Sequence, residues 1–183
     1  MNETLKIIQK RYSCRNYSDR TIDESVLNAV ATIAAQSPSA MNVKPWRIIV
    51  VTNQELIKEM DEEGLKIVSE WEDKSMYNML KARGGGAICC GAPCVVMIPM
   101  RKETGMDCGI VCQSITIAAA ALGLNSLICW QAGIALTGSK GKDFKKRLGF
   151  PEDYEFGMAV LLGYEQSPGT PREPDLSKIS YVR

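Results

Sequence analysis

The segment KRYSCRNYSDRTID, residues 10–23, places polar side chains at every second position. Arg11, Ser13 and Arg15 share the period of two that is typical of an extended strand. An arginine donates hydrogen bonds in a planar fork, which fits a phosphate or another delocalised anion. Two guanidinium groups on one face, with a hydroxyl between them, therefore indicate an anion-binding site. Ion pairs with surface carboxylates such as Asp19 or Glu24 are the alternative.

A second polar segment, SPSAMNVKPW at residues 37–46, combines two prolines with small polar residues, which predicts a loop. Pro38, Ser39 and Asn42, together with Pro45 and Trp46, would make it rigid and able to form hydrogen bonds. Two interpretations stay open: a second part of the anion site, or a connection between a helix and a strand.

The chain contains no histidine. Hydrolases and many acyl-transfer enzymes use an imidazole as general base, so general-base catalysis by histidine is excluded for this protein. Any catalysis must use carboxylates or belong to a cofactor that carries the chemistry itself.

Cysteine is frequent, and its spacing matches neither a secreted disulfide scaffold nor paired C-x-x-C metal motifs. The odd number favours free thiols in a reducing compartment, and no metal site is expected. A non-enzymatic redox or metal-binding module built on the cysteine-rich middle is the alternative from another functional class. The seven residues are Cys14, Cys89, Cys90, Cys94, Cys108, Cys112 and Cys129.

Length and composition predict one domain of 183 residues with a sizeable core. Lys and Arg number 22 and Asp and Glu 21, so no global field would attract nucleic acid or an anionic membrane. Charged or polar residues interrupt every apolar run before membrane-spanning length. We therefore expect a cytoplasmic protein.

Apolar periodicity predicts helices at 3–10 and 24–36, one or two within 54–81, one after Asp107 and a basic one within 139–150. Buried strands are predicted at 47–53, 94–100, 125–133 and 155–165, and a turn at the glycines 84–86. Asp107 is predicted to cap the helix that follows it, and this helix is apolar all round, which predicts burial on every side. Residues 166–183 are polar and Pro-rich, so they need another surface to become ordered.

Five pieces of this chain together resemble the FMN-dependent nitroreductase family, in the family's order and over nearly the whole length. They are RYSCR, SPSAMNVKPW, GAPCVV, DCGIVCQSITIAAAALGL and the closing LGFPEDY, LLGY and PREP. The resemblance implies that Arg11 binds the FMN phosphate, that Ser13 contacts the ribityl chain, and that Arg15 lies by the N1 and O2 edge of the isoalloxazine ring. There a cation stabilises the anionic reduced flavin.

Further cofactor contacts follow from the same resemblance. Arg172 corresponds to a second phosphate-binding basic residue. Pro38, Ser39 and Asn42 correspond to a segment that the neighbouring subunit contributes. The backbone at Cys129–Gln131 (Cys129, Trp130 and Gln131) corresponds to a stretch close to the flavin, although the local sequence departs from the common glycine-containing pattern.

The resemblance also implies an α+β fold of three layers, in which helices flank a mostly antiparallel central sheet. It implies an intertwined homodimer with FMN sites at the interface, so that residues 1–183 form one FMN-binding domain and 166–183 wrap the partner subunit. The implied activity is hydride transfer from NADH or NADPH to nitro compounds, quinones or related acceptors in a ping-pong cycle. Dehalogenating and flavin-modifying variants of the family are alternatives.

Overall fold

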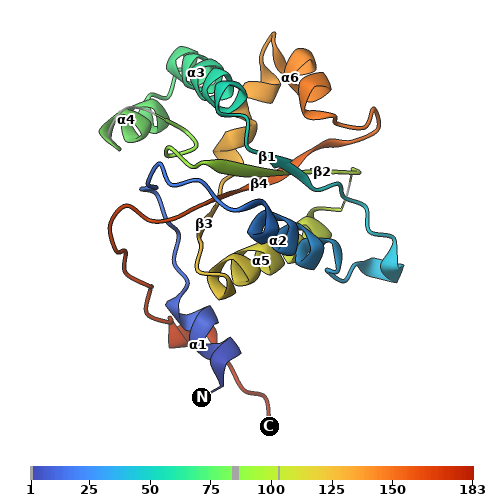
Figure 1. Cartoon of the computed structure of the whole chain (residues 1–183), viewed down its shortest axis with the longest axis vertical. Helices are drawn as coiled ribbons and strands as arrows, with labels where there is room; N and C mark the ends of the chain where they lie inside the picture. The colour runs from blue at the N-terminus through green and yellow to red at the C-terminus, as the bar shows by residue number, and fades with distance from the viewer. Residues whose placement is uncertain (1, 84–86, 103) are drawn as a thin grey trace.

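The computed structural model describes residues 2–83, 87–102 and 104–183, and a four-stranded antiparallel sheet lies at its centre (Figure 1). The strand order is β1-β2-β4-β3, so β2 and β4 are the inner strands. Their bounds are Ile49–Val51 for β1, Cys94–Met100 for β2, Asn125–Ile128 for β3 and Glu155–Gly163 for β4.

Helices cover both faces of this sheet (Figure 1). Helices α2 and α5 lie on one face, and α3, α4 and α6 on the other. The α-helices span Glu3–Lys10 (α1), Glu24–Ala35 (α2), Gln54–Glu70 (α3), Ser75–Ala82 (α4), Gly105–Ala121 (α5) and Gly141–Leu148 (α6). Short 3-10 helices span Ala40–Asn42 (η1), Trp130–Thr137 (η2) and Leu176–Lys178 (η3). The α+β, three-layer prediction is confirmed.

Two hydrophobic cores result from the alternation of side chains along the inner strands. Val95 and Met97 of β2 pack with α3 and α6, whereas Val96 and Ile98 pack with α2 and α5. A strand buried on both faces has an almost continuous apolar sequence. This is why CVVMIPM contains no polar residue and why its bounds, Cys94–Met100, agree with the prediction.

Three predicted strands need correction, and the one predicted at 155–165 ends at Gly163. The strand predicted at 47–53 is shorter and forms an edge of the described sheet, where Val50 remains 36% exposed. The strand predicted at 125–133 ends at Ile128, because the chain turns into η2 at Trp130. The predicted turn at 84–86 lies outside the described residues.

The prediction for the apolar helix α5 was wrong in two respects. It begins at Gly105, so Asp107 lies in its first turn and does not occupy the N-cap position. The helix is also not buried on every side of the single chain, since Met106 is 85% exposed and Gln113 is exposed too. No helix in the described part of the chain is both long and apolar enough to cross a membrane.

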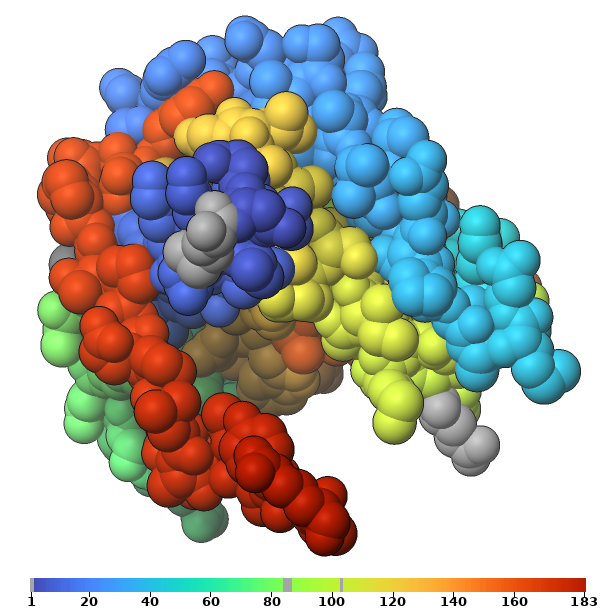
Figure 2. Space-filling view, turned by 90° about the horizontal axis from the view of Figure 1, so that it is seen from below, coloured from blue at the N-terminus to red at the C-terminus, as the bar shows by residue number. Residues whose placement is uncertain are grey.

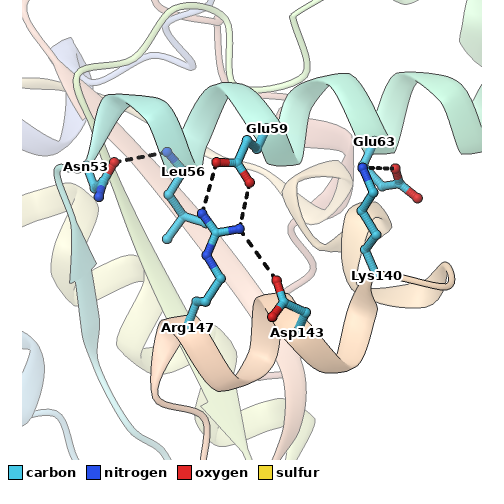
Figure 3. A network of polar contacts seen from close by, with 7 residues as sticks. All are labelled: Asn53, Leu56, Glu59, Glu63, Lys140, Asp143 and Arg147. Atoms are coloured by element: carbon cyan, nitrogen blue, oxygen red, sulfur yellow. Dashed lines mark hydrogen bonds and ion pairs between the residues drawn. The ribbon is translucent and has the colours of Figure 1, made fainter.

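Polar contacts attach α6 to α3 (Figure 3). The Arg147 guanidinium donates to both carboxylate oxygens of Glu59, at 2.6 and 3.0 Å, and lies 3.5 Å from Asp143. One turn further along α3, Lys140 Nζ lies 3.2 Å from Glu63 Oε2. The Glu63 side chain is only 5% exposed, so this lysine is the cation that compensates a buried carboxylate.

Removing that cation is expected to destabilise the fold. Lys140→Met would leave the Glu63 carboxylate buried without its cation, and we expect the free energy of unfolding to fall by about 1–2 kcal/mol. Glu63→Gln in the Lys140→Met background should recover part of the loss, because a neutral amide costs less to bury. Urea denaturation at one fixed protein concentration measures both values.

The matched control is Lys102→Met, which breaks the exposed pair between Lys102 and Glu155. Exposed pairs contribute little, so a change below about 0.5 kcal/mol is expected. Equal effects of the two lysine replacements would contradict a special role for Lys140.

Candidate functional site

The predicted arginine segment follows α1 directly. The helix ends at Lys10, and Arg11 is its C-cap residue with an extended backbone. Ser13 then forms an isolated parallel bridge with Ser126 of β3, and the Cys14 amide donates to the Ser126 carbonyl at 3.0 Å. The expected extended conformation is therefore held by pairing with the edge of β3 that faces away from β4.

A cavity of about 600 Å3 opens between α1 and the C-terminal tail. Arg11, Ser13 and Arg15 line one side, and Thr170–Pro174, which contains Arg172, lines the other. Figure 2 shows this tail, coloured red, running beside α1, which is dark blue. The structure thus brings together four residues that the sequence predicted as cofactor contacts, although 157 positions or more separate Arg172 from the other three. The volume lies within the range of roughly 300–1,000 Å3 that is usual for cofactor sites.

Three arginines and one carboxylate, Glu173, line the cavity, so positive charge predominates there. In the described part of the chain, none of Arg11, Arg15 and Arg172 forms an ion pair with a carboxylate; the predicted alternative partners Asp19 and Glu24 do not pair with them. The Arg15 guanidinium instead donates to the Ser13 carbonyl at 3.1 Å. Free guanidinium donors converging on one cavity fit the phosphate end of FMN.

The predicted contacts in the loop after α2 lie elsewhere. Pro38, Ser39 and Asn42 do not line the arginine cavity. In both Figure 1 and Figure 2 the cyan segment Ala40–Asn42 lies on the opposite side of α5 from the tail. Within one chain, the two groups of predicted contacts therefore cannot meet around one ligand.

This loop has a strained backbone. Met41, Asn42 and Lys44 all have positive φ angles, of 50, 55 and 46°. Such angles are unfavourable for residues other than glycine, and Asn tolerates them best. The Ser39 hydroxyl accepts from the Lys44 amide at 2.9 Å, which closes the loop on itself. Strain of this kind is concentrated at functional sites.

Asp107 holds the same loop against α5. Its carboxylate Oδ1 accepts from the Ala40 amide at 3.1 Å. Asp107 was predicted to cap a helix, and nothing in its spacing from Ala40 indicates this contact. Beside the bond, Met41 is 93% exposed and Met106 is 85% exposed, so the loop and the start of α5 present an apolar surface to solvent in the single chain.

The third predicted group, Cys129–Gln131, follows the end of β3. Cys129 is buried and its amide donates to the Ala159 carbonyl at 2.8 Å, whereas the Trp130 side chain is exposed. These residues do not line the arginine cavity. Because Ser13 and Ser126 form a parallel bridge, however, the chain beyond Ser126 runs in the same direction as the chain that leads to Arg15.

The thiols are free and mostly buried, as expected. Burial raises the pKa of Cys129 to about 11 and that of Cys94 to about 12, so both remain protonated at neutral pH. Among the described residues, no group of three or more His, Cys, Asp or Glu side chains is arranged to hold a metal ion.

Tyr12 was not predicted as a site residue either. It lies between Arg11 and Ser13 in sequence, and the alternation assigned it to the other face of the strand. Its hydroxyl donates a hydrogen bond to Glu165, 153 positions away. A single sequence contains no signal that connects these two residues.

Comparison with known proteins agrees with this geometry. The sequence profile of the nitroreductase family matches residues 8–164. The putative NADH dehydrogenase/NAD(P)H nitroreductase of Archaeoglobus fulgidus is 31% identical over 164 residues, which are 90% of this chain and 86% of that protein.

Solved structures are similar over the full length. A nitroreductase with bound FMN from Desulfitobacterium hafniense is 45% identical, with complete coverage of both chains and a TM-score of 0.97. An FMN-dependent nitroreductase from Clostridium difficile is 25% identical, with 99% coverage of both chains and a TM-score of 0.82. With the profile match, the fold and the arginine cavity in agreement, the chain belongs to the nitroreductase family.

Proposed function

We propose that this protein is an FMN-dependent oxidoreductase that uses NADH or NADPH to reduce nitro compounds, quinones or related electrophilic acceptors. The observation that carries the proposal is the cavity lined by Arg11, Ser13, Arg15 and Arg172. FMN, when bound, accepts two electrons from the nicotinamide and passes them to the acceptor in a separate half-reaction. The named relatives support the same cofactor and the same class of donor.

The residues of the chain then have distinct roles. Arg11 and Arg172 bind the phosphate, and Ser13 binds the ribityl chain. Arg15, further along the strand, provides positive charge at the ring, where it favours the anionic reduced form without a proton transfer. This division of labour needs no histidine, in agreement with the composition.

The complete site requires a second copy of the chain. Pro38, Ser39 and Asn42 lie on the other side of α5 from the arginine cavity, so in a homodimer they would complete the partner's site. The Cys129–Gln131 backbone would lie near the ring within the same chain. Exposed apolar side chains at the loop and at the start of α5 support this arrangement, because a stable homodimer buries such surface.

The C-terminal tail supports the dimer as well. We infer that residues 1–183 form one FMN-binding domain and that 166–183 wrap the partner subunit. Four large apolar residues of the tail are exposed in the single chain, and each needs a surface to cover it: Leu176, Ile179, Tyr181 and Val182. The cysteines have no part in the proposed reaction.

The cofactor assignment can be tested directly. The purified protein should be yellow and should release FMN, not FAD, on denaturation, because the cavity offers phosphate-binding arginines and the sequence has no glycine fingerprint for a dinucleotide. Chromatography of the released flavin identifies it. Release of FAD, or of no flavin after incubation with FMN, would overturn the assignment.

The two strand arginines should respond differently to replacement. Arg11→Ala is expected to weaken FMN binding by about 10–100-fold with little change in the two-electron potential, because phosphate contacts are alike in both redox states. Arg15→Ala should lower that potential by about 30 mV or more, since a two-electron couple shifts by 30 mV per ~1.4 kcal/mol. Anaerobic potentiometry measures the potentials, and an unchanged value in Arg15→Ala contradicts its placement at the ring.

A mixed dimer tests the shared site. One chain carries Arg11→Ala with Arg15→Ala, and the other carries Ser39→Ala with Asn42→Ala. Each homodimer should be inactive. In the heterodimer one site collects both lesions and the other collects none, so about half of the wild-type flavin content and NAD(P)H oxidation should return.

Co-expression with two different affinity tags provides the heterodimer, and mass spectrometry verifies its composition. If each lesion acted only within its own chain, both sites would stay damaged and mixing would restore nothing. That result would refute the contribution of residues 38–42 to the partner's site.

A further inference from the structure

The C-terminal tail leaves the sheet at a cluster of hydrogen bonds around the Tyr12 hydroxyl. Tyr12 donates to Glu165 Oε2 and accepts from the Asn125 amide nitrogen at 3.3 Å and from the Gly169 backbone N–H at 3.1 Å. The Gly169 N–H also lies 3.3 Å from Glu165 Oε2, and the Glu165 backbone N–H donates to Asn125 Oδ1 at 3.2 Å. Each of the four residues makes at least two of these contacts.

Gly169 packs directly on the ring of Tyr12. A Cβ atom at position 169 would collide with ring carbons of Tyr12, so this contact admits only glycine without a shift of the tail or the ring. The backbone approaches the ring closely enough to bring the Gly169 N–H to the hydroxyl. The packing contact and the hydrogen bond therefore both hold Gly169 in the same position against Tyr12.

A second set of contacts lies just before this one. The Gln166 amide donates to the Asn16 carbonyl at 3.0 Å, and Asn16 Nδ2 donates to Ser167 Oγ at 3.2 Å. Tyr17 and Glu165 also form an antiparallel bridge. The tail is thus attached to the N-terminal segment at Gln166, Ser167 and Gly169, although these three residues remain exposed.

These attachments lie next to both sides of the arginine cavity. Tyr12 stands between Arg11 and Ser13, and Gly169 immediately precedes the lining segment Thr170–Pro174. Only two residues separate Gly169 from Arg172. Of the contacts described above, those of Gly169 are therefore the nearest in sequence to Arg172.

We propose that Tyr12, Glu165 and Gly169 are positioning residues that hold Arg172 opposite Arg11 and so set the affinity of the site for the FMN phosphate. We call these three residues the tail latch. The identity of the ligand rests on the proposed function, whereas the latch itself is a property of the chain. Glu165 and Gly169 do not line the cavity and act through the arginines. Tyr12 does line it, but its hydroxyl is bound to Glu165 and Gly169.

The latch works with a neutral tyrosine. Burial and the hydrogen bond to Glu165 raise the pKa of Tyr12 above its ordinary value. The phenol therefore keeps its proton at neutral pH and continues to donate to the Glu165 carboxylate.

The central test replaces Tyr12 by Phe, which keeps the ring and removes only the hydroxyl. We expect FMN affinity to fall about tenfold, as for loss of one hydrogen bond to a charged group. Hydrogen–deuterium exchange of the Gly169 amide, which donates to Tyr12 and Glu165, should become faster in the full-length protein, with or without FMN. The two-electron potential of bound FMN should not change, because the latch acts at the phosphate end.

Two further variants separate positioning from general stability. Glu165→Gln retains an oxygen that accepts from Tyr12 and should stay within about twofold of wild type, whereas Glu165→Ala should behave like Tyr12→Phe. Gly169→Ala should weaken FMN at least as much as Tyr12→Phe. Because both lesions break one latch, the double variant Tyr12→Phe/Gly169→Ala should lose less affinity than the product of the two single effects.

The matched control is Tyr154→Phe. Tyr154 is more deeply buried than Tyr12, and it lies beside the opposite end of β4, near Arg101. Its replacement removes the same hydroxyl from another part of the core and should leave FMN affinity and tail exchange unchanged. A tenfold loss in this variant too would assign the effect to general destabilisation and overturn the latch.

The remaining outcomes distinguish the latch from the proposed function. Unchanged tail exchange in Tyr12→Phe refutes the latch whatever FMN does. Faster exchange with unchanged FMN affinity, while Arg11→Ala weakens binding, refutes the positioning role and leaves the FMN site intact. If Arg11→Ala has no effect on FMN, the cavity is not the phosphate site, and the positioning role fails together with the proposed function.

Discussion

The pairing of β2 with β4 is the contact on which the rest of the structure depends. Both strands are buried on both faces, and side chains from Val95 to Ile98 alternate between two separate cores. Apolar surface on both faces must be covered, so the fold needs a helical layer on each side. In one layer, α5 contacts the strained loop through the hydrogen bond from the Ala40 amide to Asp107. In the other layer, the ion pair between Lys140 and Glu63 attaches α6 to α3. Because the short strands β1 and β3 lie outside this pair, one side of β3 is free to bind the N-terminal strand at Ser13.

That free side of β3 determines where the arginine cavity lies. The bridge between Ser13 and Ser126 fixes Arg11 and Arg15 on an extended segment at the edge of the sheet, where the tail also leaves β4. Both ends of the chain therefore contribute to one positively charged cavity. A cavity made by two chain ends has little packing of its own, so its shape depends on a few specific contacts. The cluster around Tyr12 supplies them.

The surface on the other side of α5 from this cavity carries a strained loop and exposed apolar side chains. The loop from Ser39 to Lys44 is strained, held by Asp107, and flanked by exposed apolar side chains. Backbone strain persists only where the surrounding contacts over-determine it. A loop that is preorganised in this way loses little conformational freedom when it binds another surface. This property suits a segment that would complete a site on a second subunit.

The sequence by itself determined the bounds of β2 and the place of the helices that flank the sheet, because apolar periodicity and proline are local signals. The layered α+β fold and the grouping of Arg172 with Arg11 followed from the family resemblance, and binding of an anion by these arginines stays a prediction. Only the tertiary structure decided that Asp107 holds Ala40 and that Tyr12 bonds to Glu165, since each contact joins residues that are 67 or more positions apart. The prediction that α5 is buried on every side failed for a related reason. Hydrophobicity shows that a surface avoids water, but not whether the same chain or another one covers it.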